Sequence, residues 1–135
     1  MQYSIQVSTR HREELVDITD KVAETVAFSG ISEGTAHVFV QGATAGIMIQ
    51  ENWDDSVLID VLSMLRTHIP QGVWKHDRQD GNGDAHLKSG LIGPSETVPI
   101  VEGRLGLGRW QNIFLCEFDG PRSVRTLLIT VISGT

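Results

Sequence analysis

Residues 112–133, NIFLCEFDGPRSVRTLLITVIS, hold two apolar segments separated by a short turn. Runs rich in Ile, Val, Leu and Phe, bounded by glycine and proline, predict β-strands. We expect one strand in NIFLCEFDG (112–120) and another in SVRTLLITVIS (123–133), on either side of a turn at residues 119–122. Cys116 is the only cysteine, so an internal disulfide is excluded, and its apolar neighbours predict a small buried side chain.

Alternation of polar and apolar residues predicts further strands upstream of this segment. The strands are expected at residues 2–8, 14–19, 34–42 and 45–51. Only Gly42, Ala43 and Thr44 separate the last two, which predicts a tight antiparallel connection between them. TVPIVEGRLGLG (97–108) predicts a hairpin that turns at Glu102 and Gly103.

Two segments have the apolar spacing of helices. One is expected to begin at Asp20 and to run to about Ser29, with Gly30 just past its end. The other is DDSVLIDVLSMLRTHIP (54–70), which Pro70 ends. Residues 71–86 predict a loop, and AHLKSGLIG (85–93) fits either a short helix or a strand. The order of elements predicts an α+β fold: one compact domain over residues 1–135, with a largely antiparallel β-sandwich or sheet and two main helices.

Length and charge narrow the classes of function. A chain of 135 residues is long enough to bury a core without disulfides or metals. Its formal net charge of −6 argues against a broad basic surface for nucleic acid. No segment approaches the roughly 18 apolar residues of a membrane helix, and the N-terminus has no apolar run of signal-peptide length. We therefore expect a soluble, cytoplasmic protein that contacts neither nucleic acid nor membrane.

The loop HDRQDGNGDAH (76–86) concentrates two histidines and three carboxylates in eleven residues. Three interpretations stay open: a solvated loop, a metal site, or a pocket for an anionic substrate. His76 and His86 could bind a transition metal with one of the aspartates, although their spacing matches no standard zinc pattern. Gly81 and Gly83 could serve turns, or let backbone N–H groups approach a phosphate near Lys88.

Glu51 ends the strand AGIMIQE and carries two interpretations of its own. It is either a solvated strand end, or a general base or metal ligand at the rim of a pocket.

Four segments together carry a resemblance to a known family. They are ELVDIT (14–19), ATAGIMIQE (43–51), HDRQDGNGDAHLKSGLIGPSETVPI (76–100) and GRLGLGRWQNIFLCEFDGPR (103–122). The chain resembles the YjbQ-like family, also called the secondary thiamine-phosphate synthase family, over nearly its whole length. The resemblance implies a compact α+β unit built on a β-sandwich, and a homotrimer with clefts between subunits. It also implies a weak thiamine-phosphate synthase activity, which joins a pyrimidine pyrophosphate to a thiazole phosphate, and a divalent metal at the histidine cluster.

The resemblance carries over to individual positions. His76, Asp80, Asn82 and His86 match the family's polar loop, Glu51 matches an acid after the first hairpin, and Thr44 matches a hydroxyl in that hairpin. Gly42 and Asp84 stand where members carry histidines, so a three-histidine metal shell is not available. Two histidines with Asp84 or Glu51 would suit zinc, manganese or magnesium to different extents.

These considerations lead to a set of expected site residues. The catalytic residues are expected to be Glu51, His86 and Asp80; the substrate or phosphate ligands Thr44, Asn82, Lys88 and Ser95; and the metal ligands His76, His86 and Asp84. The expected function is an enzyme for a small anionic or phosphorylated metabolite. The alternative is a non-catalytic trimeric module that binds a metal or a metabolite, and a third interpretation is a loop that only holds the trimer together.

Overall fold

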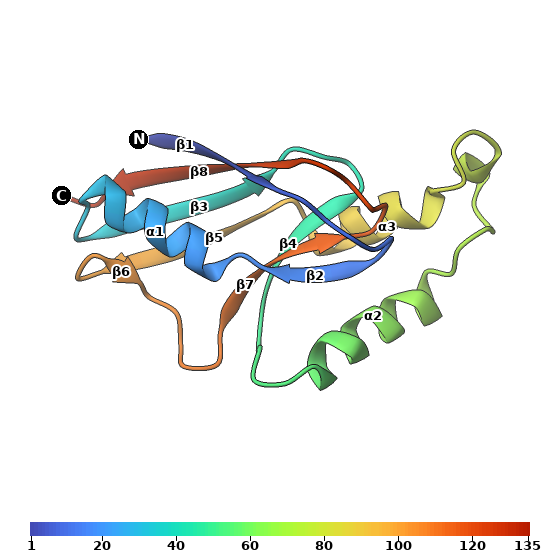
Figure 1. Ribbon diagram of the computed structural model, residues 1–135, viewed down its shortest axis with the longest axis horizontal. Helices are drawn as coiled ribbons and strands as arrows, with labels where there is room; N and C mark the ends of the chain where they lie inside the picture. Colours follow the sequence, from blue (N-terminus) through green and yellow to red (C-terminus); the bar gives the residue numbers. More distant parts are fainter.

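Two antiparallel sheets contain all the strands of the structure, a computed structural model that describes residues 1–135 (Figure 1). The larger sheet has, in spatial order, β1 (Gln2–Val7), β8 (Arg125–Ser133), β3 (Gly34–Val40), β5 (Ser95–Val101) and β6 (Arg104–Leu105). The smaller sheet has β2 (Glu14–Asp17), β7 (Asn112–Glu117) and β4 (Ala45–Gln50).

Three α-helices and one short 3₁₀ helix complete the chain. They are α1 (Thr19–Ser29), α2 (Ser56–His68), η1 (Lys75–Arg78) and α3 (Gly83–Ile92). As expected, α1 ends at Gly30, whose left-handed backbone (φ 70°) lets its N–H bond to the carbonyl of Ala27. None of the helices is long and apolar enough to cross a membrane.

The central strand of the smaller sheet, β7, explains why residues 113–116 are apolar at successive positions. Ile113 and Leu115 point into the main core, which also contains residues of α1, β3, β5 and β8. Cys116 and Phe118 point the other way, into a second core closed by Leu65 of α2 and by α3. A strand that is covered on both faces needs apolar side chains at successive positions. The predicted burial of Cys116 is confirmed.

One buried ion pair joins the two sheets. Glu117 ends the inward-facing row of β7, and Arg125 begins the inward-facing row of β8. The Arg125 guanidinium donates from both Nε and Nη2 to the two oxygens of the Glu117 carboxylate, and both side chains are almost completely enclosed. Thr9 Oγ1 also donates to Glu117 (2.7 Å). Burial favours the neutral carboxyl, but the hydrogen bonds from Arg125, the Asp119 backbone and Thr9 outweigh it and lower the pKa of Glu117.

The predicted α+β class with largely antiparallel sheets is confirmed, but the expected hairpin of residues 34–51 is wrong. β3 pairs with β5 on one side and with β8 on the other, so no edge remains for β4. β4 pairs with β7 in the smaller sheet instead. The connection has to cross between the sheets, and Gly42 lies there because a Cβ atom would come within 2.8 Å of the Arg125 guanidinium.

The structure settles the other segments. The hairpin at Glu102 and Gly103 is confirmed, and both residues have positive φ angles (53° and 78°), as a tight two-residue hairpin turn requires. Residues 71–86 are not one loop, because η1 and the start of α3 lie within them. The undecided segment 85–93 is helical, so the chain has three main helices rather than two.

The close packing of β3 on β8 generates a stability prediction at Gly34. A Cβ atom there would overlap the backbone carbonyl of Ile132. We expect Gly34→Ala to lower the free energy of unfolding by about 1–3 kcal/mol. The matched control is Gly90→Ala in α3, where a Cβ atom would meet open space. This control should raise the free energy of unfolding by about 0.5–1 kcal/mol. Urea denaturation measures both, and equal effects at the two sites would contradict the sheet packing described.

The Glu117–Arg125 pair generates a pH prediction. The pKa of Glu117 is lowered in the folded state from its ordinary value of 4.5, so the unfolded chain takes up the proton first as the pH falls. The stabilisation by the Glu117 charge is complete at pH values above the ordinary pKa of 4.5, and it is lost as the pH drops through the lower folded-state pKa. Glu117→Gln leaves the Arg125 charge uncompensated and should cost about 3–5 kcal/mol near neutral pH.

Denaturant unfolding of wild type and Glu117→Gln between neutral and acidic pH checks this. The gap between the two proteins should narrow with acidification, whereas the exposed control Glu24→Gln should stay close to wild type throughout. A gap that is independent of pH would show that the carboxylate charge of Glu117 contributes nothing.

Candidate functional site

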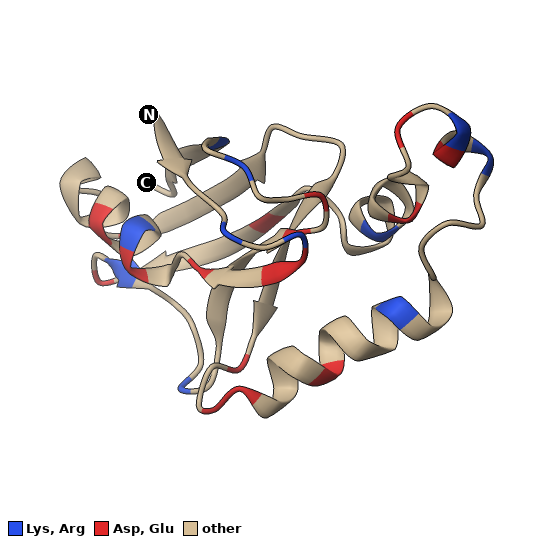
Figure 2. Ribbon diagram, turned by 45° about the vertical axis from the view of Figure 1, so that its right-hand side comes forward, with Lys and Arg blue, Asp and Glu red and all other residues tan.

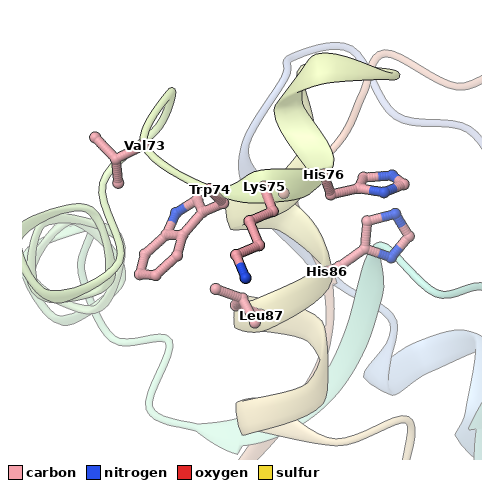
Figure 3. A pocket seen from close by; sticks show the side chains of 7 residues that line it. Val73, Trp74, Lys75, His76, His86 and Leu87 are labelled. Carbon is pink, nitrogen blue, oxygen red and sulfur yellow. The ribbon is translucent and has the colours of Figure 1, made fainter.

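The structure brings His76 and His86 together. Their ring centroids are 4.7 Å apart and the ring planes are nearly perpendicular, at 84° (Figure 3). His76 lies on η1 and His86 on the first turn of α3. The carboxylate of Asp77 joins these elements, because it accepts hydrogen bonds from the backbone N–H groups of Trp74 (2.9 Å) and Gly83 (2.8 Å).

The glycines of this loop shape it for different reasons. Gly81 has a positive φ of 68°, which a side chain would strain. Gly83 lies where a Cβ atom would come within 2.7 Å of the Trp74 Cβ, so it permits the close contact between η1 and α3. Because its N–H already donates to Asp77, Gly83 offers no free donor to a phosphate.

A hollow of about 490 Å³ lies against the two histidines. Its other lining residues are Val73, Trp74, Lys75, Gly83 and Leu87. In Figure 3 the ammonium group of Lys75 points toward Leu87. Lys75 is exposed and takes part in none of the ion pairs of the structure, so its charge is available to a ligand.

Two buried polar atoms of the loop have no hydrogen-bond partner, His76 Nε2 and Asn82 Oδ1. The nearest acid to His76 Nε2 is Asp80, whose Oδ2 lies 3.5 Å away without forming a hydrogen bond. Asn82 uses only its amide nitrogen, which donates to Asp119 (2.9 Å). Buried polar atoms normally find partners, so both are exceptions, and only His76 belongs to a residue that lines the hollow.

Asp84 and Lys88 are close in sequence to the histidines, but they belong to a buried charge cluster. Lys88 Nζ donates to Asp84 (2.8 Å) and to Glu13 (2.9 Å). Arg12 donates from both terminal nitrogens to the Asp84 carboxylate, from Nη2 to Oδ1 (3.0 Å) and from Nη1 to Oδ2 (3.2 Å).

The pKa directions in this cluster follow from these contacts. Burial raises the pKa of Asp84, but the hydrogen bonds and charges of Arg12 and Lys88 outweigh it, and the net direction is down. The hydrogen bond to Asp84 raises the pKa of Arg12. Asp84 is therefore an anion that is already neutralised, and it does not join the two histidines as a third ligand.

Glu51 lies elsewhere. It lines a second hollow, of about 270 Å³, together with Trp53 and Trp110. Of the expected acids, only Asp80 is brought next to a site histidine. The remaining expected ligands lie outside both hollows. Thr44 Oγ1 accepts a hydrogen bond from Arg125 (2.8 Å), and Ser95 begins β5 opposite Phe39.

Sequence reasoning missed part of the lining of the histidine hollow and the partners of the buried charge cluster. Lys75 and Trp74 line it, although the sequence places both directly before His76. Their adjacency was a usable signal, since a 3₁₀ turn keeps neighbouring side chains close. Arg12 and Glu13, which neutralise Asp84 and Lys88, lie 72 and 75 residues upstream of their partners, and no local pattern announces that pairing.

The chemistry open to one chain is limited by this arrangement. No group of three or more His, Cys, Asp or Glu residues is placed to share a metal ion. The Cys116 thiol is not a nucleophile, because burial raises its pKa to about 12. What remains is a pair of imidazoles, a free ammonium group and a hollow large enough for a small ligand.

The chain is similar to known proteins over nearly its whole length. The family model described as "UPF0047 protein YjbQ-like" matches residues 3–134. A UPF0047 protein of Methanocaldococcus jannaschii is 45% identical over 122 residues, which are 90% of this chain and 88% of that protein. The UPF0047 protein YugU of Bacillus subtilis is 40% identical over 132 residues, 96% of this chain and 97% of that protein. Neither name refers to thiamine phosphate or to a metal.

Solved structures agree with the fold. A YbjQ-like protein of unknown function from Sulfolobus solfataricus is 40% identical, with a TM-score of 0.94 over 98% of this chain and 96% of that one. An uncharacterized protein of the YjbQ/UPF0047 family from Clostridium acetobutylicum is also 40% identical, with a TM-score of 0.91 over 96% and 99% of the two chains. By sequence and by structure, the chain belongs to the UPF0047, YjbQ-like family.

Proposed function

We propose that the hollow at His76 and His86 binds a small anionic, phosphorylated metabolite together with a divalent metal ion, and that it is the reaction site of an enzyme. The observation that carries the proposal is the unpartnered, buried Nε2 of His76, beside the His86 ring and at the wall of the hollow. A nitrogen in this position is left without a partner unless a ligand supplies one.

The charges around the hollow support an anionic ligand. Lys88 was the expected phosphate ligand, but its ammonium group is enclosed by Glu13 and Asp84. Lys75 takes over that role, because it lines the hollow and has no carboxylate partner.

The donor set fits part of a metal shell. Two imidazoles with centroids 4.7 Å apart can each direct a nitrogen at one ion about 2.0–2.1 Å away. Asp84 cannot contribute while Arg12 and Lys88 hold its oxygens, so the remaining ligands have to come from the metabolite, from solvent or from another copy of the chain. A divalent ion bound there would neutralise charge on a departing phosphate or pyrophosphate group.

A homotrimer is part of the proposal. The half-complete donor set supports it, and so do apolar side chains beside the hollow that one chain leaves open to water. These are Val73 (66% exposed), Leu87 (44%) and Leu91 (67%). Exposed apolar residues that gather near a site favour burial against another protein surface.

Thiamine phosphate formation is the reaction we assign as a candidate. The thiazole nitrogen would form a bond to the methylene carbon of the pyrimidine, while the C–O bond breaks and its electrons leave with pyrophosphate. Lys75 would hold the leaving pyrophosphate, and His86, as a ligand of the divalent ion, would place positive charge beside it. Asp80, whose Oδ2 lies 3.5 Å from the same His76 Nε2, would accept a hydrogen bond from the bound ligand or from water held by the ion.

Metal binding gives the first test of the site. Zinc titrated into the full chain should bind, and His76→Ala and His86→Ala should each weaken binding at least about tenfold. Isothermal titration calorimetry measures this. The control is His68→Ala, an exposed histidine at the end of α2 that lies outside the hollow.

Sedimentation of the same samples tests the assembly. The expected mass is three times the chain mass of 14.8 kDa. Unchanged zinc affinity in the double variant His76→Ala/His86→Ala would remove the metal site. Dissociation of the trimer in that variant, without a change in ligand affinity, would support the interpretation that the loop only holds the subunits together.

A turnover assay separates the enzyme from the binding module. With both thiamine precursors and magnesium, the wild type should form thiamine phosphate, and His86→Ala should lower the rate at least about 100-fold. Liquid chromatography of the product measures this, with His68→Ala as the control. If the wild type forms no product but binds zinc or pyrophosphate, the non-catalytic module is favoured. An undiminished yield from His86→Ala would exclude the catalytic role of that histidine.

A further inference from the structure

The second hollow, of about 270 Å³, is lined by two tryptophans and one acid. The Trp53 and Trp110 rings meet edge to face, with centroids 6.4 Å apart and planes at 81°. Glu51 forms the rest of the wall, and its carboxylate has no hydrogen-bond or ion-pair partner in the structure. Two perpendicular aromatic rings beside an unpaired carboxylate favour a positively charged ligand.

The sheet register places these residues together. Gln50, the last residue of β4, pairs with Asn112, the first residue of β7. Glu51 and Trp53 therefore leave the sheet beside the β6–β7 loop that carries Trp110, and Figure 1 shows the two loops next to each other.

Hydrogen bonds hold both loops in position. Asn52 donates to Asp17 (2.7 Å) at the end of β2, so the loop after β4 is fastened to the neighbouring strand. In the other loop, Gly108 and Gln111 are joined by two hydrogen bonds of 2.8 and 3.0 Å, which fix the turn that presents Trp110.

The surroundings of this hollow favour positive charge in the ligand. Asp54 and Asp55 follow Trp53 directly, and Figure 2 shows acidic positions gathered where the chain enters α2. Hydrogen bonds from Ser56 lower the pKa of Asp54, so its charge persists. The structure also contains a cation on one of the walls, since the Arg109 guanidinium lies 4.9 Å from the centroid of the Trp110 ring. This ring therefore already makes a cation–π contact, and a cationic ligand would either replace the Arg109 guanidinium or use the opposite face.

We propose that Glu51, Trp53 and Trp110 form a binding site for an organic cation with an alkylated ammonium head group. Such a cation is large and weakly hydrated, so it gains from contact with indole faces that a hydrated inorganic ion would not make. The carboxylate of Glu51 supplies the opposite charge. The volume suits a head group rather than a whole metabolite, because complete small-molecule pockets span roughly 300–1,000 Å³. The site does not depend on the function proposed for the histidine hollow.

Matched ligands test the charge requirement without any mutation. Choline and its neutral carbon isostere, 3,3-dimethylbutan-1-ol, have nearly the same shape. We expect choline to bind about 2- to 30-fold more tightly, which is the range that a cation–π contact supplies from exposed to desolvated positions. NMR titration of the indole N–H signals measures this. The Trp53 and Trp110 signals should shift, while Trp74, whose Nε1 donates to the Pro70 carbonyl in another part of the molecule, is the internal reference.

Variants assign the binding to the three residues. Glu51→Gln and Trp110→Leu should each weaken choline binding several-fold, and neither should disturb the fold, because Trp110 is 49% exposed and Glu51 has no partner to lose. The controls are Glu24→Gln and Phe28→Leu, which remove an exposed acid and an exposed aromatic ring of α1. Both control variants should bind choline as tightly as the wild type does.

A further arm distinguishes the sources of the head group. A peptide that carries trimethyllysine should bind more tightly than choline if the natural ligand is a modified protein side chain, and no better than choline if it is a small metabolite; both results support the site. Equal binding of choline and its isostere, the absence of a shift at Trp53 and Trp110, or equal effects of the site and control variants would overturn the proposal.

Discussion

The ion pair between Glu117 and Arg125 is the interaction on which the rest of the structure depends. It lies between the two sheets, and its charges are removed from water, so each is tolerable only while the other is present. Thr9 and Thr44 satisfy further donors and acceptors of the pair, and through them the β1–β2 and β3–β4 connections are held at the same end of the sandwich. The pair therefore fixes the path of the chain where strands pass from one sheet to the other. Gly42 belongs to this constraint, because a Cβ atom there would come within 2.8 Å of the Arg125 guanidinium as it is placed in this chain.

A second cluster of charged side chains connects the β1–β2 connection to α3, the helix that carries His86. The β1–β2 connection that Thr9 fixes continues into Arg12 and Glu13, and these residues hold Asp84 and Lys88 on α3. Ser89 adds a hydrogen bond to the carbonyl of Ala45 (2.7 Å), which sets α3 against the start of β4. The helix that carries His86 is thus positioned by buried charges rather than by a broad apolar face. Preorganisation of this kind suits a site whose ligand has to meet both imidazoles at once.

The sequence predicted the parts of the structure that short-range patterns determine. Alternation located the strands, and glycine positions located the end of α1 and the Glu102–Gly103 turn. The partner of β4 could not be predicted, because pairing depends on which strand edges other segments have already taken. The helical nature of α3 was hidden because its buried residues include Asp84 and Lys88, which a hydrophobic pattern counts as exposed. The convergence of His76 and His86 was within reach, since a glycine-bearing loop joins them.

The separation of Glu51 from the histidines has a geometric reason with chemical consequences. α3 contacts β4 at Ala45, and Glu51 follows the opposite end of that six-residue strand. At about 3.3 Å per residue, the strand separates the two ends by roughly 20 Å. A general base has to lie within hydrogen-bond reach of the proton that it moves, so Glu51 and His86 of one chain cannot act on the same reacting atom. In the reaction proposed for the histidine hollow, any proton transfer within one chain is therefore left to groups at that hollow and to the ligand itself, while the carboxylate of Glu51 is available to the cation proposed for the second hollow.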